Sequence, residues 1–183
     1  MGTSYEAKKF IKLAALILGI TSSSTNALYA KTYLTVDQAK KVLLKDISTK
    51  TIEVILTKDQ IKSIAKASKV RVNNNRLNAQ KTENGGWFII DQVVGKHENI
   101  DIAVTLTKDG KVGGIEVLTY RETYGGEVMN PKWLAQFFGK GNDEHLKLDE
   151  QIKNISGATL SCRHITDGIN RLTHTWDQVL RYL

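Results

Sequence analysis

Residues 87–120 read WFIIDQVVGKHENIDIAVTLTKDGKVGGIEVLTY, and their pattern indicates a β-sheet. Aromatic and β-branched residues dominate Trp87–Val94, while apolar and polar residues alternate over Ile100–Leu106. Both patterns are typical of strands, and the alternation indicates a strand with one buried face. Lys108–Lys111 has the composition of a tight hairpin turn, after which Val112–Tyr120 returns as another strand. The stretch therefore predicts an antiparallel meander of at least three strands.

A long amphipathic helix is predicted near the C-terminus, from about Ser161 to Leu180. Its apolar residues recur at alternating steps of four and three: Ile165, Ile169, Leu172, Trp176 and Val179. This spacing gathers them on one helical face that needs a partner surface. Combined with the meander, the helix predicts an α+β fold in which a twisted antiparallel sheet carries helices packed on one face.

Start signals predict two shorter helices before the meander. Thr35–Gln38 and Thr57–Gln60 are capping boxes, and each precedes helically spaced apolar residues. Residues 51–56 between them fit either a short strand or a simple connection. The polar stretch 70–85 is typical of a loop followed by a turn.

A third short helix is predicted after the meander. Asn130 is a suitable N-cap, and Pro131 is favoured at the first helical position. Gly139 is a suitable end for this helix. Its expected apolar side comprises Trp133, Leu134, Phe137 and Phe138.

The N-terminus has the pattern of a secretory signal peptide. Lys8 and Lys9 precede Leu13–Ile20, an apolar stretch too short to span a bilayer comfortably. Small residues then favour cleavage after Ala30, with Ala27 as the alternative site. An uncleaved membrane anchor is the less favoured reading of the same residues.

These patterns predict the domain organisation and the location of the protein. We expect residues 1–30 to be the signal peptide, 31–85 an N-terminal helical segment and 86–183 the functional domain. The mature protein is then periplasmic or otherwise extracytoplasmic, with membrane anchoring as the alternative.

Composition narrows the classes of function. The chain has 183 residues, 41% of them hydrophobic, which suits a globular core. Its net charge of +7 comes from dispersed lysines without a basic patch interleaved with aromatic residues, so nucleic-acid binding is not predicted. The single cysteine, Cys162, excludes a disulfide within the chain. No metal-ligand spacing and no Ser-His-Asp arrangement is present, so we predict neither metal ligands nor catalytic residues.

The segment Ser156–Ser161 (SGATLS) lies directly before the long helix and has the features of a phosphate site. Gly157 and Ala158 allow a ligand to approach the backbone, and Thr159 adds a hydroxyl. A helix N-terminus supplies free N–H groups and a positive dipole end. We expect Ser161 to cap the helix while Thr159 points outward. The ordinary alternative is a plain Ser-Gly turn.

Two further polar segments lie at strand ends. In Tyr120–Glu127, Arg121 could pair with a phosphate or carboxylate, and Tyr124 could stack on a planar ring. The alternative is a solvated loop with a salt bridge between Arg121 and a glutamate. Gly95–Glu98 contains a His-Glu pair, which is more typical of a surface than of catalysis.

Taken in order, these segments resemble the FMN-binding domain family. The resemblance rests on Glu122–Gly125 at a strand end and on Ser156–Thr159 before a helix, and Gly95–Glu98 also echoes the family pattern. The family includes the C-terminal domains of the C subunit of the sodium-translocating NADH:quinone reductase and of the G subunit of the Rnf complex. The resemblance covers about residues 86–180 and is greatest to small exported members.

The resemblance implies that FMN is joined to Thr159 by a phosphoester. It also implies a separate flavin transferase, which takes FMN from FAD with Mg²⁺ outside the cytoplasm. Glu122 and Thr123 match a pair that lies close to the flavin, whereas Tyr124 stands where the family has proline. The remaining residues implied around the attachment point are Ser156, Gly157, Ala158, Leu160 and Ser161.

The function implied by the resemblance is electron transfer. We expect an exported carrier with a membrane or periplasmic redox partner, rather than a substrate-specific enzyme. The alternatives are a protein that binds FMN without a covalent bond and an exported interaction module without a cofactor.

Overall fold

The computed structural model describes residues 31–183. The predicted signal peptide, residues 1–30, lies outside the described residues. Within the described range, none of the helices combines the length and apolar character required to cross a membrane.

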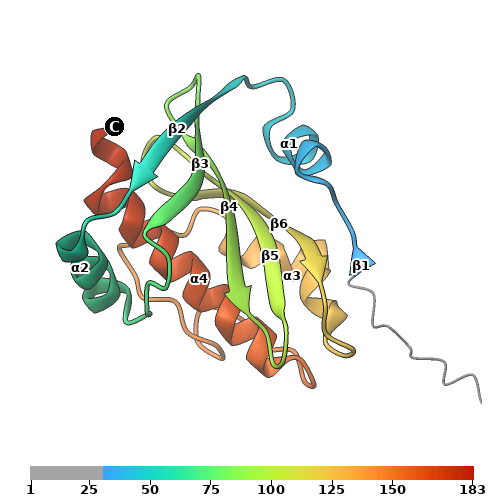
Figure 1. Ribbon diagram of the computed structural model, residues 1–183. Coiled ribbons are helices and arrows are strands. Elements are labelled where there is room, and N and C mark those ends of the chain that lie inside the picture. Colours follow the sequence, from blue (N-terminus) through green and yellow to red (C-terminus); the bar gives the residue numbers. More distant parts are fainter. Residues whose placement is uncertain (1–30) are drawn as a thin grey trace, which may run out of the picture.

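The described residues build one antiparallel six-stranded sheet with the strand order β1-β6-β5-β4-β3-β2 (Figure 1). The strands are β1 (Lys31–Thr32), β2 (Thr49–Ile55), β3 (Arg76–Thr82), β4 (Trp87–Val94), β5 (Asn99–Leu106) and β6 (Val112–Tyr120). The predicted meander is confirmed as β4, β5 and β6. Residues 51–56 belong mostly to a strand rather than to a connection.

The expectation that residues 70–85 form only a loop and a turn is wrong, because β3 lies within them. Strand β3 (RLNAQKT) has few apolar residues, so its sequence alternates only weakly. It pairs with β2 on one side and with β4 on the other, from Asn78↔Ile90 to Lys81↔Trp87. Main-chain hydrogen bonds to the two neighbouring strands therefore stabilise β3, although its side-chain pattern gives little indication of a strand.

The predicted helix starts are confirmed by the hydrogen bonds that cap them. Helices α1 (Val36–Leu44) and α2 (Lys58–Ser68) each begin with a complete capping box. The side chain of Asn130 caps the short helix α3 (Pro131–Leu134), which lies between the 3₁₀ turns η1 (Gly126–Met129) and η2 (Ala135–Phe137). Phe138 does not join the apolar side of this region, because it is 52% exposed.

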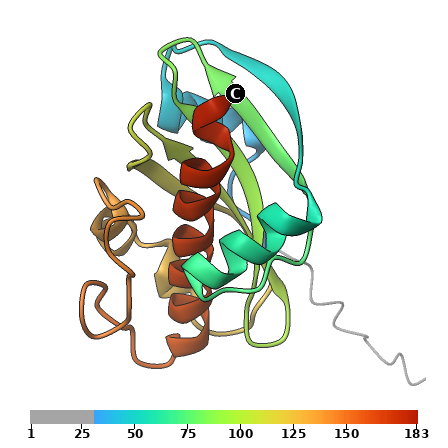
Figure 2. The ribbon, with the colours of Figure 1, turned by 90° about the vertical axis from the view of Figure 1, so that its left-hand side faces the viewer.

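Helix α4 (Thr159–Gln178) lies along one face of the sheet, and η3 (Leu180–Tyr182) follows it. The whole predicted apolar stripe of α4 is buried in the main core. Figure 2 shows α2 beside α4 on the same face. The predicted α+β class, the antiparallel sheet and the long C-terminal helix are therefore confirmed.

The structure adds a second layer on the opposite face, where the sequence analysis placed no helix. Ala39 and Leu44 of α1 pack there against Phe88, Ala103 and Leu118 from three neighbouring strands. These strand residues alternate with those that face α4, so the central strands are apolar on both faces. Helices thus cover both faces of the sheet, although the larger core lies under α4.

Candidate functional site

Three segments that are far apart in the sequence meet at one end of the sheet. They are the β4–β5 turn (residues 95–98), the loop after β6 (residues 121–125) and the first turn of α4. Figure 1 shows the β4–β5 turn and the start of α4 at the same end of the molecule. Side-chain contacts connect the loop after β6 to both of the other segments.

Tyr120, the last residue of β6, connects the loop to α4. Its hydroxyl donates to the carbonyl oxygen of Tyr124 at 2.6 Å and lies 3.1 Å from Ser161 Oγ. Burial raises the pKa of Tyr120, so the phenol stays protonated and can donate. The expectation that Ser161 caps the helix is wrong: the helix begins two residues earlier, and the buried Ser161 hydroxyl faces Tyr120 instead.

Gly125 allows the loop to lie directly against the start of α4. Its φ of +88° belongs to the left-handed region. A Cβ at this position would lie 2.6 Å from the Tyr120 hydroxyl and 3.1 Å from the Cβ of Ala158. The two motifs that carry the family resemblance are therefore in direct contact, through Gly125 and Ala158.

Glu122 connects the loop to the β4–β5 turn. Its Oε1 accepts main-chain hydrogen bonds from His97 at 2.5 Å and Glu98 at 3.0 Å. A Cβ at Gly95 would lie 2.5 Å from the same oxygen, so the glycine leaves room for the carboxylate. Gly95–Glu98 therefore binds the Glu122 carboxylate through its main chain and does not form a His-Glu dyad.

These donors also determine the charge of Glu122. Burial by itself raises the pKa of Glu122, but the main-chain N–H groups of Glu98, His97 and Lys96 outweigh it and lower the pKa below its ordinary value. The carboxylate is therefore ionised at neutral pH and is occupied within the loop.

Arg121 pairs with a partner that the sequence analysis did not name. Its Nη2 lies 2.7 Å from Asp101 Oδ2, and its Nη1 donates to the carbonyl of Asn99 at 2.9 Å. The alternative of a salt bridge to a glutamate is therefore wrong. The ion pair secures the loop to the start of β5.

The SGAT segment leaves its backbone open at the start of α4. Ser156 and Gly157 are exposed, and nothing lies within 4 Å of the point where a Cβ of Gly157 would be. Ala158 is buried at the N-cap, and Thr159 is half-buried as the first helical residue. Leu160 is 38% exposed. The glycine therefore gives a ligand access to the backbone beside the Thr159 hydroxyl.

The first turn of α4 has unused hydrogen-bond donors. No side chain among residues 31–183 caps the helix, and its first main-chain bond runs from Cys162 N to Ala158 O at 2.9 Å. The N–H groups of Thr159, Leu160 and Ser161 therefore lie at the positive end of the helix dipole without a capping side chain. Such a turn suits a phosphate group.

Asn154 lies beside Thr159 and has one satisfied and one unsatisfied amide atom. Its Nδ2 donates to Thr159 Oγ1 at 3.2 Å. Its Oδ1 is buried and has no hydrogen-bond partner within the described part of the chain. Leaving such an atom unpaired costs about 1–3 kcal/mol, so this amide is not explained by stability alone.

Two of the predicted site residues direct their side chains toward solvent. Thr123 is exposed, and the ring of Tyr124 is 83% exposed although its carbonyl is held by Tyr120. An exposed aromatic ring on an anchored backbone offers a flat surface to a planar ligand.

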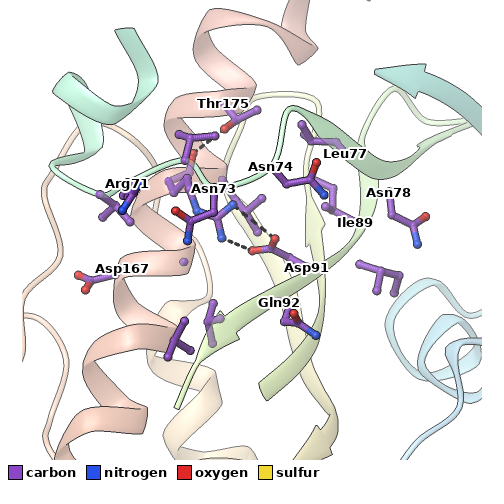
Figure 3. Close-up of a pocket in the computed structure, with 18 of the residues that line it drawn as sticks. Arg71, Asn73, Asn74, Leu77, Asn78, Ile89, Asp91, Gln92, Asp167 and Thr175 are labelled. Carbon is purple, nitrogen blue, oxygen red and sulfur yellow. Dashed lines mark hydrogen bonds and ion pairs between the residues drawn. The ribbon is translucent and has the colours of Figure 1, made fainter. Parts of the chain in front are cut away.

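A separate cavity of about 570 Å³ lies between β4, α4 and the connection that follows α2 (Figure 3). Asp91 faces it from β4 and is paired with Arg171 of α4 at 2.6 Å. Asp167 also lines it, and burial raises the pKa of this carboxyl. The lining contains none of the predicted site residues. Sequence reasoning missed this cavity because its residues come from distant segments without a local motif.

No group of three or more His, Cys, Asp or Glu side chains is placed to hold a metal ion in the part of the chain that the structure describes. Cys162 is fully buried, and burial raises the pKa of its thiol, which makes the thiol unreactive.

Comparison with known proteins identifies the region that contains the site. Residues 95–174 match the family model of the FMN-binding domain. These residues belong to the FMN-binding domain family. The FMN-binding domain extends here from the β4–β5 turn into α4. It therefore includes the turn that binds the Glu122 carboxylate, the loop after β6 and the SGAT segment. Its cofactor is FMN.

The chain is also similar to the C subunit of the Na(+)-translocating NADH-quinone reductase of Vibrio anguillarum. The two are 26% identical over 155 residues, which cover 79% of this chain and 51% of the relative. The chain therefore spans about half the length of the curated relative that it matches.

The residues at the start of α4 fit the phosphate of FMN. The uncapped N–H groups and the helix dipole suit an anion, Gly157 leaves the backbone accessible, and Thr159 offers a hydroxyl whose oxygen accepts a hydrogen bond from Asn154 Nδ2. The exposed Tyr124 ring, on the loop whose Gly125 lies against Ala158, suits a planar group.

Proposed function

We propose that this protein is an exported electron carrier whose FMN is joined through a phosphoester to Thr159 Oγ1. The observation that carries the proposal is the position of Thr159: it lies on the uncapped first turn of α4, within the FMN-binding domain. Contact between Gly125 and Ala158 brings the loop after β6 to the same place.

Each segment of the site has a role in this proposal. The Thr159 oxygen and the N–H groups of the first turn of α4 hold the phosphate, while Gly157 keeps the approach open. The Tyr124 ring offers a surface for the isoalloxazine. Glu122 holds the loop in place through the β4–β5 turn. When bound, FMN supplies one- and two-electron redox chemistry.

The carrier role is proposed from the relative, which is part of an NADH-quinone reductase. We propose a membrane or periplasmic protein as the redox partner. The ion translocation in the relative's name is not carried over, because this chain covers only about half of that relative.

Maturation requires a further partner in this proposal. Residues 1–30 direct export, and a flavin transferase outside the cytoplasm then attaches FMN from FAD with Mg²⁺. The signal-peptide pattern at Lys8–Lys9 and Leu13–Ile20 supports this location.

The test is expression in a periplasm that contains a flavin transferase, followed by denaturation. We expect yellow in-gel fluorescence and an increase in intact mass equal to one attached FMN. Thr159→Ala should abolish both signals, because it removes the only side-chain oxygen at that position. Thr159→Ser keeps a hydroxyl and should retain labelling.

Two other results would contradict the covalent proposal. Flavin that is released on denaturation indicates FMN binding without a covalent bond. A colourless protein of unmodified mass, purified from cells in which a control substrate is labelled, indicates an interaction module without a cofactor.

A further inference from the structure

We propose that Asn154 is the positioning residue for attachment of FMN, because its amide holds the Thr159 hydroxyl oxygen in place for the transfer. The inference rests on the proposed function above and adds a second residue to it. Asn154 lies on the connection before the SGAT segment, five residues from Thr159, and touches the reacting atom directly.

The hydrogen bond leaves the hydroxyl ready to react. Asn154 Nδ2 is the donor and Thr159 Oγ1 the acceptor, at 3.2 Å. One lone pair of the oxygen is therefore occupied by Asn154, and the hydroxyl hydrogen is not needed for this contact. A side chain that would otherwise rotate among three staggered positions is biased toward one.

The backbone that carries Asn154 is held from another element. Trp133 Nε1 donates to the carbonyl of Lys153 at 2.7 Å, and the N–H of Lys153 donates to Gln136 Oε1 at 2.8 Å. Residues of α3 and η2 thus secure the residue next to Asn154 through both its N–H and its carbonyl. The backbone next to Asn154 is therefore fixed, which allows the Asn154 amide to hold the Thr159 hydroxyl in one position.

Asn170 shows what a purely structural asparagine does in the same fold. Its Oδ1 accepts from Leu146 N at 3.0 Å and its Nδ2 donates to Leu146 O at 2.9 Å, so both amide atoms are paired. Asn154 pairs only the atom that faces Thr159, and its Oδ1 is buried without a partner among the described residues. This difference indicates that the amide of Asn154 serves to bind the Thr159 hydroxyl rather than to satisfy hydrogen bonds of the fold.

Asn154 assists the step that forms the phosphoester. Thr159 Oγ1 forms a bond to the phosphorus of the FMN half of FAD, and the pyrophosphate P–O bond breaks. AMP leaves with the bonding electron pair, and the hydroxyl proton passes to solvent or to a base of the transferase. FAD and the transferase supply every other component.

The test uses the intact mature protein as the substrate of a flavin transferase with FAD and Mg²⁺, and follows the added mass with time. Asn154→Asp keeps the shape of the side chain but replaces the donor with an acceptor, and Asn154→Ala removes it. For both variants we expect kcat of transfer to fall at least about tenfold, with KM for the protein substrate little changed. Their thermal unfolding midpoints should remain close to that of the unmodified sequence.

Asn142→Asp is the matched control. Asn142 lies on the same connection between η2 and α4, and no side-chain hydrogen bond of it is found in the described range 31–183. The same change of charge should leave kcat unchanged there.

An Asn154→Asp protein that is labelled with the original kcat would overturn the inference. So would a loss confined to KM, which indicates recognition by the transferase, or a loss that merely follows the unfolded fraction. These results differ from failure of the proposed function, in which the unmodified sequence itself is not labelled.

Discussion

The carboxylate of a single residue, Glu122, holds the loop after β6 to the β4–β5 turn. It accepts main-chain N–H groups of the β4–β5 turn, and the absence of a side chain at Gly95 leaves room for it. Ionised acceptors form stronger hydrogen bonds than neutral ones, so its protonation should loosen the loop that leads to Tyr124. The site is therefore predicted to respond to acid through a residue that does not contact Thr159.

We expect Glu122→Gln to lower stability at neutral pH but not at low pH. The ordinary pKa of a glutamate is 4.5, and that of Glu122 is lower in the folded protein. Its stabilisation is therefore fully present above pH 4.5 and is lost as the pH falls through the folded pKa. Urea unfolding should give a difference of roughly 0.5–1 kcal/mol at about pH 7, which declines toward zero as the pH falls below 4.5 and through the folded pKa.

The control for this prediction is Glu150→Gln, because Glu150 forms only an exposed ion pair with Lys147. Its effect should be smaller at neutral pH. A Glu122→Gln penalty that stays constant from neutral to acidic pH would contradict the anchoring role.

Among the secondary-structure elements, the packing of α4 against β4 determines where the first turn of α4 lies. Gly168 is buried within the helix, and a Cβ there would lie 2.6 Å from Val93 Cγ1. The glycine therefore lowers helix propensity but lets the strand approach closely. The pair Asp91–Arg171 fastens the same two elements about one helical turn away.

We expect Gly168→Ala to destabilise the protein despite the better helix propensity of alanine. The gain in propensity is about 1 kcal/mol, whereas overpacking a core commonly costs about 1–3 kcal/mol. Val93→Ala alone should cost about 2 kcal/mol by leaving a cavity. In the Val93→Ala background, Gly168→Ala should be neutral or stabilising, because the clashing methyl group is gone. A double-mutant cycle by chemical unfolding measures the coupling, and additive effects of the two changes would show that no contact limits residue 168.

At the scale of the whole molecule, the sheet extends beyond the region that matches the FMN-binding domain. The match begins at residue 95, yet β4 lies at the centre of the sheet, and β2, β3 and α2 lie beyond it. Val54, Ile64 and Ala79 from these outer elements belong to the main core, and Ala39 of α1 covers the opposite face. The division at residue 86 stays a prediction that truncation can test.

We expect a chain of residues 86–183 to lose cooperative folding, whereas residues 31–183 should retain it. The truncation uncovers the apolar face under α2, leaves one edge of β4 unpaired and removes the apolar cover of Phe88. Thermal unfolding followed by near-UV circular dichroism distinguishes the two chains. A sharp transition in the shorter chain would show that the N-terminal elements are an addition to an independent domain.

The features that could be predicted from sequence share a local cause. The capping boxes that begin at Thr35 and Thr57 are each four residues long, and these four residues are enough to define the start of a helix. The apolar stripe from Ile165 to Val179 follows from helical periodicity alone. The family resemblance also rests on contiguous motifs, so it could be recognised from the sequence, whereas the roles of Thr159 and Glu122 stay a prediction. Such signals depend on neighbours along the chain, so they are present before the chain folds.

Tertiary packing decided the features whose causes lie in distant residues. Strand β3 exists because β2 and β4 pair with it, and Arg121 pairs with Asp101 because β5 runs beside β6. Ser161 faces Tyr120 instead of capping α4, and Asn154 reaches Thr159 only because the connection folds back beside it. Residues that lie close together along the chain were, by contrast, enough to predict the caps of α1 and α2, the meander β4–β6 and the apolar stripe of α4. Only the folded structure decided which hydrogen-bond partner each polar side chain has, because those partners are brought together by burial of a shared core.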